Sequence, residues 1–125
     1  MKKYINEHIY LKAFLLGFLT ALCMFLPYLV VDKGFFTYAG DFNSQQIPFY
    51  MYMNQMVKSG SLNWGWAIDL GSSVVNSYSF YLLGSPFFWL TLPFPTEWVP
   101  YLMAPLLVLK LAFASLAAYG YTSRF

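Results

Sequence analysis

The chain of 125 residues is 59% hydrophobic and 10% charged, whereas an ordinary soluble domain carries roughly 25% charged residues. Aromatic residues make up 22% of it, and a membrane protein can place such amphipathic rings at its two interfaces. The net charge of +2 comes from scattered Lys and Arg, without the basic stripe of a nucleic-acid-binding protein. Composition therefore favours a protein whose partner is the lipid bilayer, and excludes nucleic acid.

The first long apolar segment, residues 13–31, has nineteen consecutive residues without a charge. At a rise of about 1.5 Å per residue it reaches about 28 Å, close to the hydrocarbon thickness of a bilayer. This pattern predicts a transmembrane helix. A cleaved signal peptide is the alternative, because Lys2 and Lys3 precede the segment, but the segment is longer than a signal core and no small-residue cleavage site follows it.

The charges on either side of this segment predict its orientation. Lys2, Lys3 and Lys12 precede it, whereas Asp32 and Lys33 cancel one another after it. Since positive charge favours the cytoplasmic side, residues 1–12 are expected to be a cytoplasmic N-terminus, and residues 32–98 an extracellular loop.

Two segments of that loop are expected to lie at the membrane. Residues 45–58 predict an amphipathic surface helix, with a polar stripe that repeats every four residues: Gln46, Tyr50, Asn54 and Lys58. Residues 78–95 are apolar enough to resemble a span, but residues 84–86 (Gly-Ser-Pro) interrupt them and two prolines crowd their end. A re-entrant or interfacial segment is therefore the better interpretation.

Residues 99–121 predict a second transmembrane helix, and Arg124 places residues 122–125 in the cytoplasm if two spans cross. The expected fold is an all-α, multi-pass protein of the cell membrane, in which two transmembrane helices are joined by a large extracellular loop with interfacial or re-entrant helices. Two or three membrane elements bury little surface against one another, and the chain ends just after an apolar segment. We therefore expect a fragment of a larger protein.

Asp41 is the first candidate catalytic residue, because it follows Gly40 about ten residues beyond the first span. A carboxylate at the outer surface can act as a general base on an acceptor hydroxyl, or hold a divalent metal beside a phosphate. The alternative is a loop aspartate that caps the following helix. One acidic residue does not decide between them, and spacing alone favours the cap.

Three further residues are candidates for substrate binding. Asp69 is a second outer carboxylate, able to contact a sugar hydroxyl or to terminate a turn before Gly71. Trp66, close to Trp64, can stack on a sugar or anchor the loop among lipid headgroups. Lys110 lies near the middle of the second predicted span, where a lysine is costly unless it faces a polar interior, a lipid phosphate or a carboxylate, or snorkels to the interface. No metal-binding cluster appears in the sequence.

Residues 40–50 (GDFNSQQIPFY), 64–66 (WGW), 71–72 (GS) and 78–87 (YSFYLLGSPF) together resemble the beginning of the YfhO family of bacterial membrane proteins. Members of this family are large polytopic proteins of Gram-positive bacteria. The family is similar to multispan glycosyltransferases of the GT-C fold class, which use a polyprenyl-phosphate sugar on the outer leaflet. In that class the first outer loop carries the catalytic aspartate and membrane-surface helices.

The resemblance implies that Asp41 matches the catalytic aspartate and residues 45–58 a surface helix. It also implies sugar transfer to lipoteichoic acid or a related cell-envelope polymer. Asp41 would deprotonate or orient the acceptor hydroxyl while polyprenyl phosphate departs, and a divalent cation is one way to offset the leaving charge. The alternatives are a transporter or flippase subunit for a lipid-linked substrate, and a small structural membrane protein.

Overall fold

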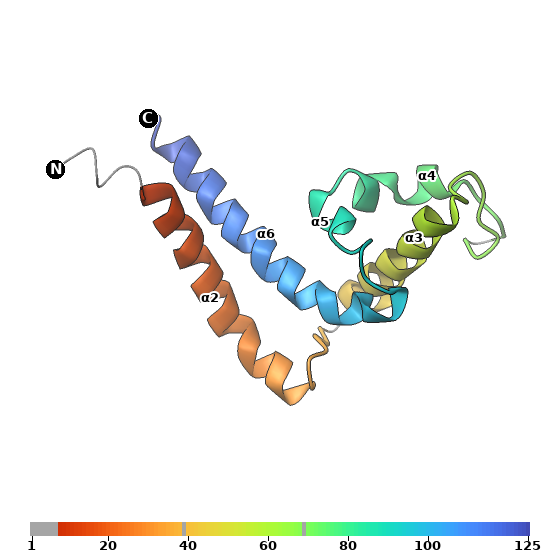
Figure 1. Ribbon diagram of the computed structural model, residues 1–125, viewed down its shortest axis with the longest axis horizontal. Helices are drawn as coiled ribbons and strands as arrows, with labels where there is room; N and C mark the ends of the chain where they lie inside the picture. The colour runs from red at the N-terminus through yellow and green to blue at the C-terminus, as the bar shows by residue number, and fades with distance from the viewer. Residues whose placement is uncertain (1–7, 39, 69) are drawn as a thin grey trace. The chain divides into compact units, whose positions relative to one another are not determined.

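The computed structural model describes residues 8–38, 40–68 and 70–125 (Figure 1). These residues form helices and no β-strand, and an isolated antiparallel bridge joins Gly65 to Ser72. The chain divides into two compact units: unit 1 comprises Met1–Phe36 and Ala104–Phe125, and unit 2 comprises Thr37–Met103. The described part of the chain is therefore helical, as its sequence predicts.

Helix α2 extends over Ile9–Val31 and is long and apolar enough to cross a membrane. Its 23 residues correspond to about 34 Å at 1.5 Å per residue, slightly more than the hydrocarbon core. The helix begins four residues before the charge-free segment and includes Lys12, because a lysine near a helix end can reach the headgroups. Pro27 lies inside the helix without ending it.

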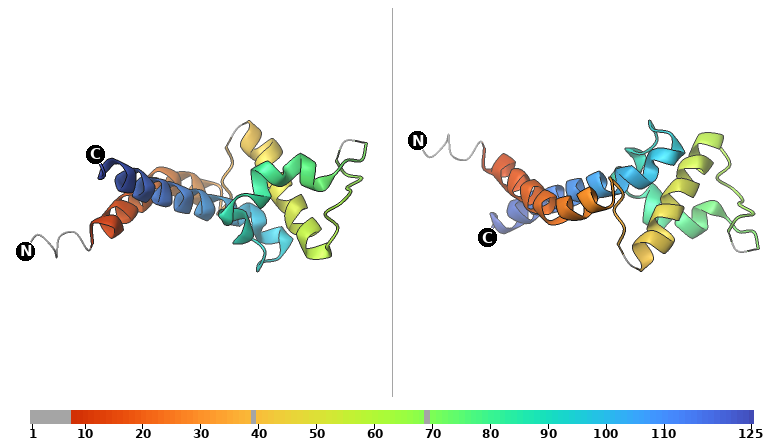
Figure 2. Two further views of the ribbon diagram at one scale, coloured as in Figure 1. Left: turned by 90° about the horizontal axis from the view of Figure 1, so that it is seen from above. Right: turned by 90° about the horizontal axis from the view of Figure 1, so that it is seen from below.

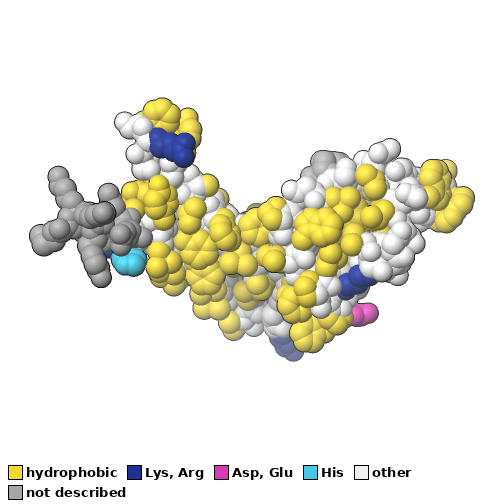
Figure 3. Space-filling view, turned by 45° about the horizontal axis from the view of Figure 1, so that its top comes forward, with side chains coloured by type: hydrophobic (Ala, Val, Ile, Leu, Met, Phe, Trp, Pro, Cys, Tyr) yellow, Lys and Arg dark blue, Asp and Glu magenta, His cyan; other side chains and the backbone are white. Residues whose placement is uncertain are grey.

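Helix α6, Val99–Thr122, follows a 3₁₀ turn η3 at Thr96–Trp98, and together they form the second segment able to cross a membrane. Pro105 lies inside it. Both helices leave much of their apolar surface uncovered, as a lipid environment requires. In Figure 3, hydrophobic side chains dominate the visible surface. The two candidate membrane helices expected from hydropathy are therefore present.

Within unit 1, α2 and α6 cross in contact with one another (Figure 2). A Cβ added to Gly17 would lie 2.5 Å from Cβ of Ser115, so the helices approach most closely where one of them has no side chain. The Ser115 hydroxyl donates a hydrogen bond of 2.9 Å to the carbonyl of Ala13. Tyr10 and Tyr119 meet edge to face, with ring centroids 5.3 Å apart. Small residues and interhelical hydrogen bonds are the usual basis of helix pairing in lipid.

Unit 2 is built from short helices around one longer one. A π-helical turn η1, Phe42–Gln46, leads into α3, Ile47–Ser59, which ends in a left-handed glycine at Gly60. The remaining helices are α4 at Val74–Tyr78, the π-helical η2 at Ser79–Leu83, α5 at Pro86–Trp89, and η3. The core side chains include Tyr50 and Met53 of α3, Leu82 of η2 and Phe88 of α5. The rings of Tyr50 and Phe88 meet edge to face, with centroids 5.7 Å apart.

The segment 78–95 contains the interruption that its sequence predicts. Helix η2 ends at Leu83, Gly84 and Ser85 lie outside any helix, and α5 starts again with Pro86 in its first turn. The helices of this segment have only four or five residues, about 6–8 Å at 1.5 Å per residue, which is far short of a bilayer.

Candidate functional site

Asp41 lies at the start of unit 2, in the position before η1, and its side chain is exposed. The turn around it is fixed by other groups: the amides of Asn43 and Ser44 both donate to the Gly40 carbonyl, and the Asn43 side chain accepts from the amide of Tyr38. These three hydrogen bonds close the turn, and none of them uses the Asp41 carboxylate.

The Asp41 side chain does not cap the helix that follows. Among the described residues it makes no capping hydrogen bond to a backbone amide. Its Oδ1 instead accepts a hydrogen bond of 3.3 Å from Nε2 of Gln45, one helical turn later. This contact orients one carboxylate oxygen, and the capping role that spacing alone favours is not the one observed.

The middle of the predicted polar stripe faces the interior of unit 2, whereas Lys58 at its end is exposed. Tyr50 and Asn54 are buried, and Asn54 has no exposed surface (0%). Its Nδ2 donates to the carbonyl of Thr91 at 3.0 Å and to its hydroxyl at 3.2 Å, while the Thr96 hydroxyl donates to Asn54 Oδ1 at 2.9 Å. Lys58 Nζ donates to the carbonyl of Phe94. The stripe thus connects α3 to the segment that leads into α6, a role that periodicity in a single helix did not reveal.

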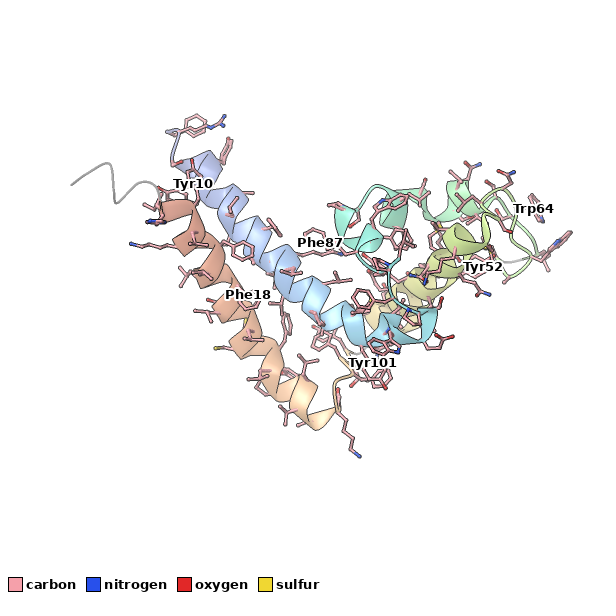
Figure 4. The ribbon with its side chains drawn as sticks, viewed as in Figure 1. Tyr10, Phe18, Tyr52, Trp64, Phe87 and Tyr101 are labelled. Carbon is pink, nitrogen blue, oxygen red and sulfur yellow. The ribbon has the colours of Figure 1, made fainter. Side chains whose placement is uncertain are left out.

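Trp66 and Trp64 lie on the loop between α3 and α4, and Figure 4 labels Trp64 there. Their rings meet edge to face, with centroids 5.9 Å apart, and both are exposed. Tyr52 of α3 places its ring beneath this loop, and its buried hydroxyl has no hydrogen-bond partner within the described residues. No feature of the sequence distinguished Tyr52 from the other tyrosines.

Lys110 belongs to the part of α6 in unit 1, where its side chain is partly exposed. Asp69 falls outside the described residues. Asp41 and Trp66 belong to unit 2, whereas Lys110 belongs to unit 1.

Sequence reasoning also missed a cavity of about 350 Å³ in unit 1, where α2 begins and α6 ends. Its lining combines aromatic rings, small residues and a guanidinium: Tyr10, Leu116, Ala117, Gly120, Tyr121 and Arg124. Gly120 opens this space, since a Cβ there would touch the Tyr10 ring at 3.5 Å.

The donor set for a metal ion is incomplete in the described part of the chain. No group of three or more His, Cys, Asp or Glu side chains comes together there. Asp41 by itself offers one carboxylate beside a glutamine amide.

A family model described as "Bacterial membrane protein YfhO" matches residues 13–124. The match includes α2 from residue 13 onward, all of α6 and the whole of unit 2. No curated protein and no solved structure matches the chain significantly.

Proposed function

The chain belongs to the YfhO family of bacterial membrane proteins, and we propose that it forms part of a membrane glycosyltransferase. In this proposal a sugar passes from a polyprenyl-phosphate donor to a cell-envelope polymer, such as lipoteichoic acid, on the outer face of the membrane. The observation that carries the proposal is the Asp41 carboxylate, which is exposed, held on a fixed turn, and not used to cap a helix.

The proposed topology follows from charge and helix length. Residues 1–12 and 122–125 lie in the cytoplasm, and residues 32–98 form the outer loop. The reason is that Lys2, Lys3 and Lys12 lie at the start of the first candidate membrane helix and Arg124 follows the end of the second. Within this loop, residues 45–58 and 78–95 lie at the interface. The short broken helices of 78–95 support that placement, since none of them can span a bilayer.

Asp41 acts as the general base in the proposed reaction. Gln45 holds Oδ1, which leaves Oδ2 to accept a proton. The acceptor hydroxyl oxygen attacks the anomeric carbon with inversion, its proton passes to Asp41, and the bond from that carbon to the phosphate oxygen breaks, so that polyprenyl phosphate leaves with the electron pair. Asp69, Trp66 and Lys110 are secondary candidates for contacts to the donor or acceptor.

The test is an Asp41→Asn variant of the protein expressed in full from its own gene. A positioned general base contributes about 10²–10⁴-fold, so transfer of labelled sugar from polyprenyl phosphate to the polymer should fall by about 100-fold or more. Glu97→Gln is the matched control, because Glu97 is an exposed acid of the same unit. If Asp41→Asn transfers sugar as fast as Glu97→Gln, the assignment of Asp41 is wrong.

A transporter or flippase for a lipid-linked substrate is the second candidate, and Lys110 favours it. This lysine lies within a helix able to cross a membrane and is partly buried, where an ionisable group most often marks a substrate path. Transport would appear as movement of the labelled lipid between leaflets, sensitive to Lys110→Met and indifferent to Asp41→Asn. Sugar transfer instead requires the Asp41 carboxylate, so the effect of Asp41→Asn separates the two functions.

A further inference from the structure

The loop between α3 and α4 has two apolar faces, and only one of them is covered. Ile68 (6% exposed) faces inward beside Val74, and the Tyr52 hydroxyl meets Gly65 where a Cβ would collide with it. The opposite face consists of Trp64, Trp66 and Leu70, which are 52%, 79% and 96% exposed. We call these three residues the indole tip. Figure 3 shows hydrophobic side chains gathered at the end of unit 2 that carries this loop.

Hydrogen bonds between described residues close the loop that carries the indole tip. Gly65 and Ser72 exchange two hydrogen bonds of 2.9 and 3.1 Å, and the amide of Gly71 donates to the Ile68 carbonyl at 2.8 Å. Gly71 has a φ of +105°, and a Cβ there would lie 3.0 Å from each of the two indoles. Both rings therefore lie against Gly71, where a larger residue would displace them.

The composition around the tip indicates its partner. From residue 59 to residue 96, Asp69 is the only charged residue, so the segment lacks the charges that would pair with an anionic or a basic macromolecule. Indole rings concentrate at the lipid–water interface, where the apolar ring and the N–H are both satisfied. A sugar can stack its C–H face on an indole, but its hydroxyls offer no apolar surface to Leu70, whose side chain is almost wholly exposed.

We propose that the indole tip is a membrane anchor, in which Trp64, Trp66 and Leu70 enter the lipid–water interface and hold unit 2 at the bilayer surface. The attraction is apolar and does not depend on anionic lipid. The anchor goes beyond the transferase proposal and requires only a bilayer, so its failure would leave the assignment of Asp41 untouched.

The experiment measures the depth of a nitroxide at position 70. Cys23 is the one native cysteine, so a Cys23→Ser background allows a single label at Leu70→Cys, where almost no packing is lost. Asn76→Cys, exposed on α4 and outside the two segments proposed to lie at the interface, is the matched control. The labelled chain is reconstituted in phosphatidylcholine vesicles, and collision of the nitroxide with oxygen is compared with collision with a water-soluble nickel chelate.

We expect the label at position 70 to collide more with oxygen and less with the nickel chelate than the label at position 76. The difference should be the same when phosphatidylglycerol is added. Replacing both indoles, Trp64→Ser with Trp66→Ser, should return it to the value of the control. Equal nickel accessibility at the two positions would overturn the proposal. A depth that appears only with phosphatidylglycerol, or that survives loss of both indoles, would also overturn it. So would a water-exposed label that a polyprenyl-phosphate sugar immobilises, since the indoles would then serve the sugar.

Discussion

Replacement of Asn54 by leucine should release α3 from the segment that leads into α6. Leucine has the same number and branching of side-chain heavy atoms as asparagine, so the change removes hydrogen bonds without leaving a cavity. Asn54 is fully buried and bonds to Thr91 on one side and to Thr96 on the other. The variant loses both connections while the packing around position 54 stays filled.

The expected cost is about 2 kcal/mol, at about 1 kcal/mol net for each of the two connections. The cost is not larger because Thr91 retains two other hydrogen bonds in the variant. Its carbonyl still accepts from the amide of Phe94 at 3.1 Å, and its hydroxyl still donates to the carbonyl of Phe88 at 2.7 Å. No group of Thr91 is therefore left wholly unpaired. The loss corresponds to about a 30-fold rise in the opened population of unit 2, at 1.4 kcal/mol per factor of ten.

The rate of cleavage by trypsin measures this opening of unit 2. Lys58 is the only Lys or Arg between residues 37 and 103, and cleavage after it requires the last turns of α3, including Asn54, to unfold. When reclosing is fast, the cleavage rate follows the opened population, so Asn54→Leu should be cut after Lys58 about 30-fold faster. Cleavage after Lys33, in unit 1, should not change.

The control is Gln55→Leu, because Gln55 is the next residue of α3 and is exposed. An exposed substitution of this kind changes stability by about 0.5 kcal/mol or less. If Asn54→Leu and Gln55→Leu are cut after Lys58 at equal rates, the buried polar network does not hold α3 in place, and the reasoning is refuted.

Two further predictions concern glycines. Gly17→Val should weaken the pairing of α2 with α6 by about 1–3 kcal/mol, because the new Cβ would lie 2.5 Å from Cβ of Ser115. The variant should therefore lose its helical circular dichroism at a lower SDS fraction than the unchanged protein. The control is Leu16→Val at an exposed position of α2, and equal SDS midpoints for the two variants would contradict the prediction. Gly60→Ala should cost about 1 kcal/mol, since Gly60 has a φ of +71° in otherwise open space, and should speed cleavage after Lys58. Gly84→Ala should leave the rate of cleavage after Lys58 unchanged, because Gly84 has a φ of −78° and a Cβ there would lie 3.8 Å from the Ser79 carbonyl oxygen. Equal cleavage rates for the two variants would show that alanine is not strained at position 60.

The membrane helices, the interrupted segment and the family could each be predicted from the sequence, for different reasons. Hydropathy over some twenty residues is a property of the chain itself, so α2 and α6 could be predicted without knowing what surrounds them. The interruption at Gly84–Pro86 was equally local, because proline and glycine act on their own backbone. The residues that carry the YfhO resemblance identified the family, which the family model confirms over residues 13–124.

What the tertiary structure alone decided is which partner each polar or small residue has. Periodicity placed Tyr50 and Asn54 on one face of a helix, but only the fold shows that Thr91 and Thr96, some forty residues later, cover that face. The same holds for Gly17 and Ser115, which are separated by most of the chain and meet in one helix contact. A sequence states the chemistry of each side chain, whereas burial and pairing depend on long-range contacts that no local pattern encodes.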